Sequence, residues 1–241
     1  MNSTFKIPEY ATVDFEFCSY NRDHLILISG AIMGRYQPGI ITKLEGRALH
    51  LQENRAVTDQ EWKHLVKHLQ YIFKDKLNLL YPVLAQLYDS DHTVSPNLTQ
   101  PRIKQQLDKY DAILTWEGST DKQILQLLDI TKPIFSLRGW DLHMDGNFVL
   151  LITDYGDNQP IASIPIGKYR KNGRSLKLNE AHTLMCSDLY FHGGLEAHDP
   201  RADVQWTRCL FLQIYKKHRD IINEAVWAKQ EKKRNILPAP I

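Results

Sequence analysis

The sequence has few cysteines, no long apolar run and little excess charge. Its three cysteines, Cys18, Cys186 and Cys209, lie far apart and form no C-x-x-C pair. An odd and widely spaced set predicts neither a disulfide framework nor a structural zinc site, and it fits a reducing compartment. No apolar segment is long enough to span a bilayer, and residues 1–9 lack the apolar core of a secretory signal. We therefore expect an intracellular protein, cytoplasmic or nuclear, with no membrane partner.

The near-neutral charge says little about partners. The formal net charge is +2 over 241 residues, whereas nucleic-acid-binding domains are often strongly basic. A site built of carboxylates can still act on nucleic acid, because bound cations reverse the local sign of the charge. The composition, 43% hydrophobic and 24% charged, is typical of a globular domain with one sizeable core.

The first third of the chain predicts strands followed by a helix. Residues 11–17, 24–33 and 39–44 are rich in β-forming residues, and the first two segments are expected to form a hairpin. Thr58 and Glu61 form a capping-box pattern, and apolar residues then follow at helical spacing.

The rest of the chain alternates between helical and extended patterns. We expect a helical insertion around residues 77–100, with a loop over 89–100, and a helix that Pro101 opens and that runs to about residue 109. Further predicted elements are strands at 111–116, 134–142 and 148–154, helices at 120–128 and 179–186, and a long last helix that Asp199 caps and Pro200 opens. This order predicts an α/β protein with a mixed sheet between helical layers, in one domain over 1–228, and a flexible basic tail over 229–241.

Two acidic residues lie two apart on the first predicted strand. Asp14 and Glu16 would project from one face while their apolar neighbours fill the other. Two adjacent carboxylates repel each other, and a divalent metal with a preference for oxygen ligands would compensate. Taken alone, the pair is more typical of the acidic solvent face of an edge strand.

A third acid follows a strand and a glycine turn. Asp121 comes after the predicted strand 111–116 and after Gly118, where sites of α/β proteins commonly form. By itself, Asp121 is better explained as a residue that caps the helix or complements its dipole.

The last helix opens with a histidine and an acid. His198 precedes its first residue and Asp203 lies in its first turns, so both are expected to face one site. Alone, this pattern is that of an ordinary capped helix with an exposed histidine.

In combination, the three motifs are far more specific. A D-x-E on an early strand, an Asp after a strand and glycine turn, and H-x₄-D opening a late helix occur in the order of the DEDDh exonucleases, a family with an RNase H-like three-layer fold. The sequence resembles that family over roughly residues 12–216. It departs from the family pattern at Glu117, where Asn is usual, and at Phe17, where a small or polar residue is usual.

The resemblance implies a metal-dependent 3′→5′ exonuclease that releases nucleoside 5′-monophosphates from single-stranded RNA or DNA. It implies two Mg²⁺ or Mn²⁺ ions held by four carboxylates, with His198 as the general base. Candidate nucleic-acid contacts are the backbone around Phe17 and Cys18 and a basic segment that contains Lys168, Arg170, Lys171 and Arg174. The exposed basic segment is equally typical of a solvated surface turn.

Three other functions remain open from the sequence. The chain could be an inactive RNase H-like module that binds nucleic acid or acts as a scaffold, a phosphodiesterase or endonuclease with the same ions, or a structural α/β protein. The presence of all five site residues favours the enzyme.

Overall fold

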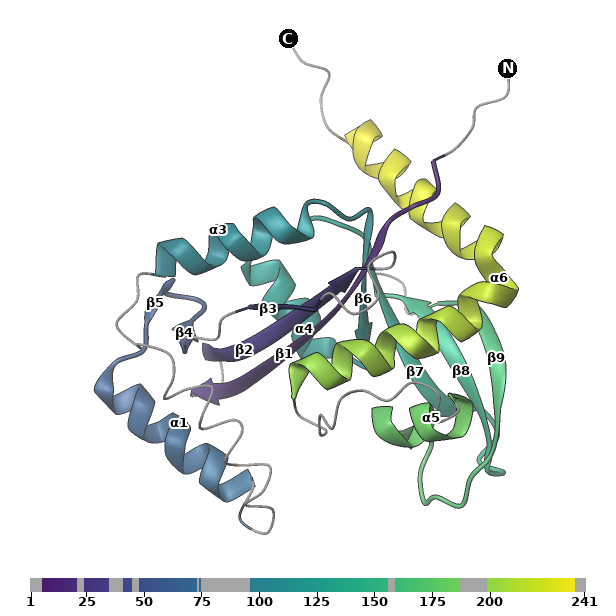
Figure 1. Cartoon of the computed structure of the whole chain (residues 1–241), viewed down its shortest axis with the longest axis horizontal. Coiled ribbons are helices and arrows are strands. Elements are labelled where there is room, and N and C mark those ends of the chain that lie inside the picture. Colours follow the sequence, from purple (N-terminus) through teal and green to yellow (C-terminus); the bar gives the residue numbers. More distant parts are fainter. Residues whose placement is uncertain are drawn as a thin grey trace.

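A computed structural model describes residues 6–20, 24–34, 41–44, 48–72, 74, 96–155, 159–186 and 199–236. The protein is an α/β fold in which the described strands form one mixed sheet (Figure 1). The strands are β1 (Tyr10–Tyr20), β2 (His24–Gly34), β3 (Ile41–Leu44), β4 (Leu49–His50), β5 (Arg55–Ala56), β6 (Ala112–Trp116), β7 (Ile134–Asp141), β8 (Asn147–Asp154), β9 (Pro160–Lys168) and β10 (Ser175–Leu176). The helices are α1 (Asp59–Ile72), α3 (Pro96–Leu107), α4 (Ser119–Leu127), α5 (Leu178–Met185) and α6 (Pro200–Ile236).

The sheet combines parallel and antiparallel pairs. Its main order is β5-β4-β2-β1-β6-β7-β8-β9, with β3 paired to β2 and β10 paired to β7. The three central strands β1, β6 and β7 are parallel to one another, and β1 with β2 forms the predicted antiparallel hairpin. Strands β8 and β9 extend the sheet by antiparallel pairing. The carboxyl ends of the three parallel strands therefore share one edge, where sites of α/β proteins form.

Helices cover both faces of the sheet, as the predicted layered arrangement requires. On one face, α5 and α6 pack on β6, β7 and β8 through a cluster that includes Phe135, Phe148 and Phe211. On the other face, α3 and α4 pack on β1 and β6. Helix α1 contributes Leu65 and Leu69 to a smaller cluster with β2. No helix in the described part of the chain combines the length and the apolar character that a membrane span needs.

Local sequence signals explain several element ends. Helix α1 begins as predicted, because Glu61 accepts the Thr58 backbone N–H at 2.7 Å and the Thr58 hydroxyl accepts the Glu61 N–H at 3.3 Å. Asp199 caps α6 by accepting the Arg201 N–H at 2.9 Å, and Pro200 is the first residue of that helix.

Four expectations need correction. Helix α3 begins at Pro96 rather than at Pro101, so Pro101 lies inside the helix. A single internal proline removes one backbone hydrogen bond, and the helix tolerates this loss. Its first turn replaces the end of the loop expected over 89–100, and the expected helix over 77–87 lies outside the described residues. Helix α6 continues to Ile236, so residues 229–236 of the expected flexible tail are helical. Strand β9 was not predicted, because its prolines obscure the pattern.

Candidate active site

Asp14 and Glu16 lie on the central strand β1, as the alternation of polar and apolar residues predicts. Their neighbours Val13 and Phe15 are buried in the core that α3 and α4 cover. The two carboxylates project toward the other face, where they meet Asp203 of α6. One carboxylate oxygen from each of these three residues lies within 4.8 Å of the others. A bulge between Glu16 and Phe17 then interrupts the pairing of β1 with β2.

The start of α6 is fixed across the β1–β2 hairpin by hydrogen bonds that the sequence does not reveal. The Thr12 hydroxyl donates to the backbone carbonyl of Val204 at 3.1 Å, and Arg208 Nε donates to the carbonyl of Gly34 at 3.1 Å. Val204 is itself buried against Ala31 and Met33 of β2. Because Val204 directly follows Asp203 in α6, these contacts hold the turn that carries its carboxylate over β1.

Asp121 joins the cluster from the opposite side of the sheet. It lies in the first turn of α4, and its Oδ1 accepts the backbone N–H of Phe15 at 3.2 Å. The turn before it is tight. Glu117 has a φ of 49°, in the left-handed region of backbone conformation, and a Cβ on Gly118 would lie 2.2 Å from Asp121 Oδ2. The glycine therefore allows the Asp121 side chain to fold back toward β1.

The electrostatics of the cluster follow from burial and mutual repulsion. Burial raises the pKa of Asp14 well above its usual range, and the carboxylates of Asp203, Asp121 and Glu16 raise it further. Burial, followed by the charges of Asp203 and Asp121, raises the pKa of Glu16 to about 8. Burial also raises the pKa of Asp121 to about 7, although the hydrogen bond from Phe15 opposes the shift. The cluster therefore favours a bound proton or a bound cation.

Asp14 provides the clearest sign that the cluster suits a cation. Its Oδ2 is buried and accepts no hydrogen bond from the residues that the structure describes, although a buried carboxylate oxygen ordinarily has a partner. Beside it, Glu16 and Asp203 each supply a carboxylate oxygen within 4.8 Å. Oxygen donors of this kind are the ligands that Mg²⁺ and Mn²⁺ prefer. The donor set thus fits the divalent ions that the sequence predicts.

The remaining predicted site residues differ in their position and burial. His198 lies outside the described residues. Cys18 is buried beneath α1, where burial raises the pKa of its thiol to about 12, so its side chain is not available to a ligand. Phe17 is partly buried against the core under α3 and α4. Any contact of Phe17 and Cys18 with a substrate would therefore depend mainly on the backbone.

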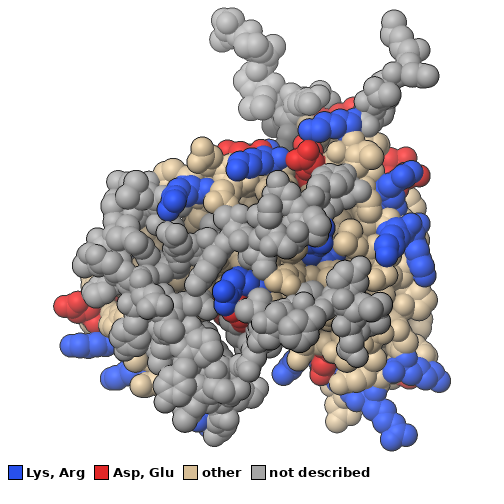
Figure 2. All heavy atoms as spheres, viewed as in Figure 1, with Lys and Arg blue, Asp and Glu red and all other residues tan. Residues whose placement is uncertain are grey.

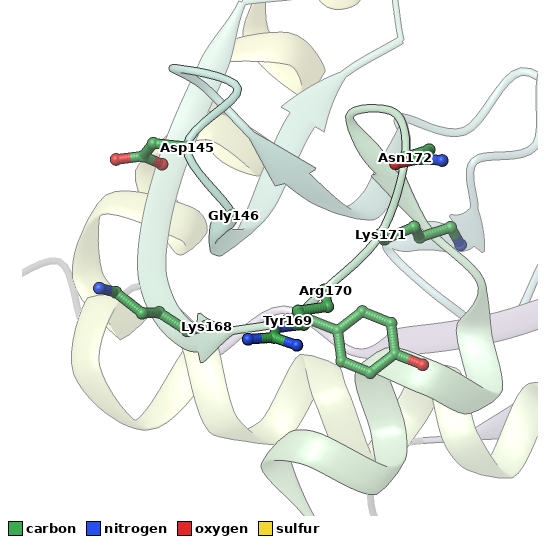
Figure 3. A pocket seen from close by; sticks show the side chains of 7 residues that line it. All are labelled: Asp145, Gly146, Lys168, Tyr169, Arg170, Lys171 and Asn172. Atoms are coloured by element: carbon green, nitrogen blue, oxygen red, sulfur yellow. The ribbon is translucent and has the colours of Figure 1, made fainter.

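The basic segment lies at the end of β9 and lines an open hollow of about 770 Å³ (Figure 3). Lys168 and Arg170 contribute to the lining, together with Asp145 of the β7–β8 turn. Lys171 also lines the hollow, but its ammonium group is paired with Glu180 of α5. In Figure 3 the Lys171 side chain points away from that of Lys168. Of these three cations, Lys168 and Arg170 are the better candidates for a ligand.

A short path of contacts links the basic segment to the acidic cluster. The carbonyl of Arg174 accepts the Asp141 N–H at 2.8 Å, at the carboxyl end of β7. The next residue, Ser175, donates its hydroxyl to Glu117, which precedes the Gly118 turn. Figure 2 shows Lys and Arg side chains at the border of the molecule where Figure 1 places β9 and α5. The basic segment thus leads to the edge of the sheet that carries Asp121.

Two contributions to the site were not expected from the sequence. Asp199, predicted only as a helix cap, adds negative charge that raises the pKa of both Asp14 and Glu16. Glu117 was noted only as a departure from the family pattern, yet it accepts the Ser175 hydroxyl beside the site. Neither role has a signal in the sequence, since each depends on contacts between distant segments.

Comparisons with protein-family models, with curated proteins and with solved structures find no match to this chain. A function for this protein is therefore inferred from the geometry and chemistry of its site.

Proposed function

We propose that this chain is a metal-dependent 3′→5′ exonuclease with an RNase H-like fold, acting on single-stranded RNA or DNA. The observation that carries the proposal is the convergence of carboxylates from distant parts of the chain. Asp14 and Glu16 from β1 and Asp203 from α6 lie within 4.8 Å of one another, and Asp121 reaches the same strand through the N–H of Phe15. Such a cluster opposes folding unless it binds protons or cations. Its presence in the folded protein therefore favours a function that uses the carboxylates.

The positions of the motifs support the RNase H-like assignment. The D-x-E pair lies on the central strand β1, and Asp121 opens the helix that follows the parallel strand β6. Asp203 lies on α6, the late helix that packs across β1 and β2. This is the order of motifs that the resemblance to DEDDh exonucleases implies.

The four carboxylates are proposed as the residues that hold two Mg²⁺ or Mn²⁺ ions. Asp14 is the best candidate for a shared ligand, because no residue in the described part of the chain donates a hydrogen bond to its buried Oδ2. When bound, ions of this kind lower the pKa of water and stabilise charge on the leaving oxygen of a phosphodiester. The protein's own part is to hold the oxygens in place through the Thr12–Val204 and Phe15–Asp121 hydrogen bonds.

His198 completes the proposed machinery as the general base. In the sequence it directly precedes Asp199, the residue that caps α6, and Asp203 lies in the first turn of that helix. A neutral imidazole near pH 7 suits the removal of a proton from an attacking water. The released product would be a nucleoside 5′-monophosphate.

The test is a cleavage assay with 5′-labelled single-stranded RNA and DNA in Mg²⁺, in Mn²⁺ and in chelator. We expect a metal-dependent ladder that shortens from the 3′ end and disappears in Asp14→Asn. Metal-dependent internal cuts would instead identify an endonuclease. Tight binding of the oligonucleotide without any product, in all metals, would overturn the proposal and leave an inactive nucleic-acid-binding module.

A further inference from the structure

A second cluster of potential metal ligands lies at the other end of the β1–β2 hairpin. It consists of His24 at the start of β2, His50 at the end of β4 and Glu53 in the turn before β5. His24 faces Tyr20 in the hairpin, whereas Asp14 faces Ala31. At about 3.3 Å per residue, the two clusters are roughly 20 Å apart along β2. They are therefore separate sites.

The three ligand atoms have the spacing of a single metal centre. His24 Nδ1 lies 2.9 Å from His50 Nε2, and Glu53 Oε1 lies 3.7 Å from the first nitrogen and 3.5 Å from the second. A circle through three points at these separations has a radius of about 2.0 Å, which equals the usual zinc–nitrogen and zinc–oxygen distances. An ion near the centre of this triangle would contact all three atoms without movement of the backbone.

Neighbouring side chains fix the orientation of these ligands. Arg55 donates to Glu53 Oε2 at 2.6 Å, so Oε1 remains directed toward the two rings. The same guanidinium binds both oxygens of Glu61 at 2.7 Å, and Glu61 Oε1 lies 3.6 Å from His50 Nε2. Such partners in the outer shell orient ligands in metal sites.

The charge balance and exposure of the cluster suit a dication. Two carboxylates, Glu53 and Glu61, lie beside the two imidazole rings, and the single positive charge of Arg55 offsets only one of them. His50 is fully buried, whereas 39% of the His24 side chain and 44% of the Glu53 side chain are exposed. An ion would therefore be held on its inner side by His50 and could take water as a further ligand on its outer side.

We propose that His24, His50 and Glu53 form a binding site for Zn²⁺ or a similar transition-metal ion. Two imidazoles and one carboxylate, with one position open to water, are a ligand set that zinc accepts, whereas Mg²⁺ prefers oxygen ligands alone. The bound ion would join β2, β4 and the turn before β5, at the edge of the sheet. The site does not depend on the proposed nuclease activity.

Binding requires one proton to move. His50 Nδ1 accepts the Glu53 N–H at 3.2 Å, so in the metal-free protein the His50 proton lies on Nε2 and is donated to His24 Nδ1. An ion at Nε2 requires this proton to pass to Nδ1, which breaks the hydrogen bond from Glu53. That bond is at the long end of the usual range, so its loss is small beside the gain of three ligand bonds.

The experiment measures Zn²⁺ on the full-length protein by calorimetric titration in Mg²⁺-containing buffer and by metal analysis after dialysis. We expect one tightly held equivalent in the wild type and at least an approximately 100-fold weaker affinity in His24→Gln and in Glu53→Gln, since both remove a direct ligand. These side chains are partly exposed, so both variants are expected to fold even if His50→Gln does not.

Two control variants separate this site from others that could take zinc. Asp14→Asn alters the acidic cluster, and the double variant His64→Gln/His68→Gln removes a pair of stacked rings on α1 whose centroids are 6.3 Å apart. Both controls should retain the bound equivalent. The proposal is overturned if the wild type binds no Zn²⁺, if His24→Gln and Glu53→Gln bind it as the wild type does, or if either control loses it. None of these results would bear on cleavage by the acidic cluster.

Discussion

Asp121 accepts a hydrogen bond at 3.2 Å from the backbone N–H of Phe15, the residue between the two acids of β1. One carboxylate thus serves both the fold and the candidate site. It ties the first turn of α4 to the central strand, and it brings a third negative charge to Asp14.

This double role predicts different effects for two substitutions of Asp121. Asp121→Ala leaves the buried Phe15 N–H without an acceptor, which costs about 1–3 kcal/mol of unfolding free energy. Asp121→Asn removes the same charge but keeps an oxygen acceptor, so it should be more stable than Asp121→Ala by about 1–3 kcal/mol. Both variants should lose metal-dependent cleavage by at least about 100-fold, because both remove a charged ligand. Urea unfolding and the cleavage assay measure the two effects, and equal stability of the two variants would contradict the structural role.

Gly118 also affects the site, because any side chain at this position would collide with Asp121. In Gly118→Ala the new Cβ would lie 2.2 Å from Asp121 Oδ2 and 2.9 Å from Thr115 Cβ, so the Asp121 side chain must move. We expect a loss of about 1–3 kcal/mol in stability, as overpacking typically costs, and about a 100-fold loss of cleavage. Ser119→Ala is the matched control, since Ser119 is adjacent and exposed. Cleavage by Gly118→Ala at the wild-type rate would show that Asp121 is not needed where the structure places it.

The raised pKa values of the acidic cluster predict a pH-dependent stability in chelator. The folded protein keeps protons on Glu16 up to a pKa of about 8, compared with a usual value of 4.5, and on Asp121 up to about 7. Between these limits the native state binds more protons than the unfolded state. The contribution of Glu16 and Asp121 to the unfolding free energy is therefore largest below about pH 4 and falls as the pH rises to about 8.

Asp14→Asn tests the same effect by removing one charge from the cluster. At pH 8 in chelator we expect a higher Tm than in the wild type, by about 2–4 °C for each kcal/mol of repulsion relieved, and a weaker dependence on pH. Asp129→Asn, which removes an exposed carboxylate on another part of the surface, should leave the pH dependence unchanged. A wild-type Tm that rises steadily between pH 5 and 8 would contradict the raised pKa values.

The sequence predicts the elements of this fold better than the contacts between them. Alternation in β1 and the cap of α6 have local causes, so the faces of Asp14 and Glu16 and the start of α6 could be predicted. Strand β9 was missed because Pro165 removes a backbone donor, which is tolerated since β9 lies at the edge of the sheet. Helix α3 was predicted to start too late because Pro101 resembles a first helical residue.

The two candidate sites could likewise be predicted only where local sequence patterns determine them, and not where contacts between distant segments do. The order of Asp14, Glu16, Asp121 and Asp203 suggested a common site, but each motif alone had an ordinary structural explanation. Their proximity depends on the parallel pairing of β1 with β6 and on the hydrogen bond from Thr12 to Val204. The His24–His50–Glu53 cluster had no such guide, because it arises from the pairing of β2 with β4.

The hollow at the end of β9 leads to a last prediction, on how the substrate is bound. If Lys168 and Arg170 contact phosphates, the double variant Lys168→Ala/Arg170→Ala should bind single-stranded oligonucleotides more weakly. For a single strand, each lost phosphate contact lowers the slope of log affinity against log salt by about 0.7, so a decrease of about 1.4 is expected for two contacts. Because neither residue belongs to the acidic cluster, kcat should stay within about 3-fold while KM rises.

Two further variants decide whether the position of the charge matters. Lys171→Ala should lower the salt slope less than the double variant does, because Lys171 is paired with Glu180. Lys104→Ala removes one distant charge on α3 and should leave the salt slope unchanged. Fluorescence anisotropy over a series of salt concentrations measures all four proteins. An unchanged salt slope in the double variant, or an equal decrease in Lys104→Ala, would mean that the hollow at the end of β9 lies off the path of the nucleic acid. A decrease confined to the double variant would place the bound strand between this hollow and the carboxylates of Asp14 and Asp121, along the edge that Ser175 and Glu117 connect.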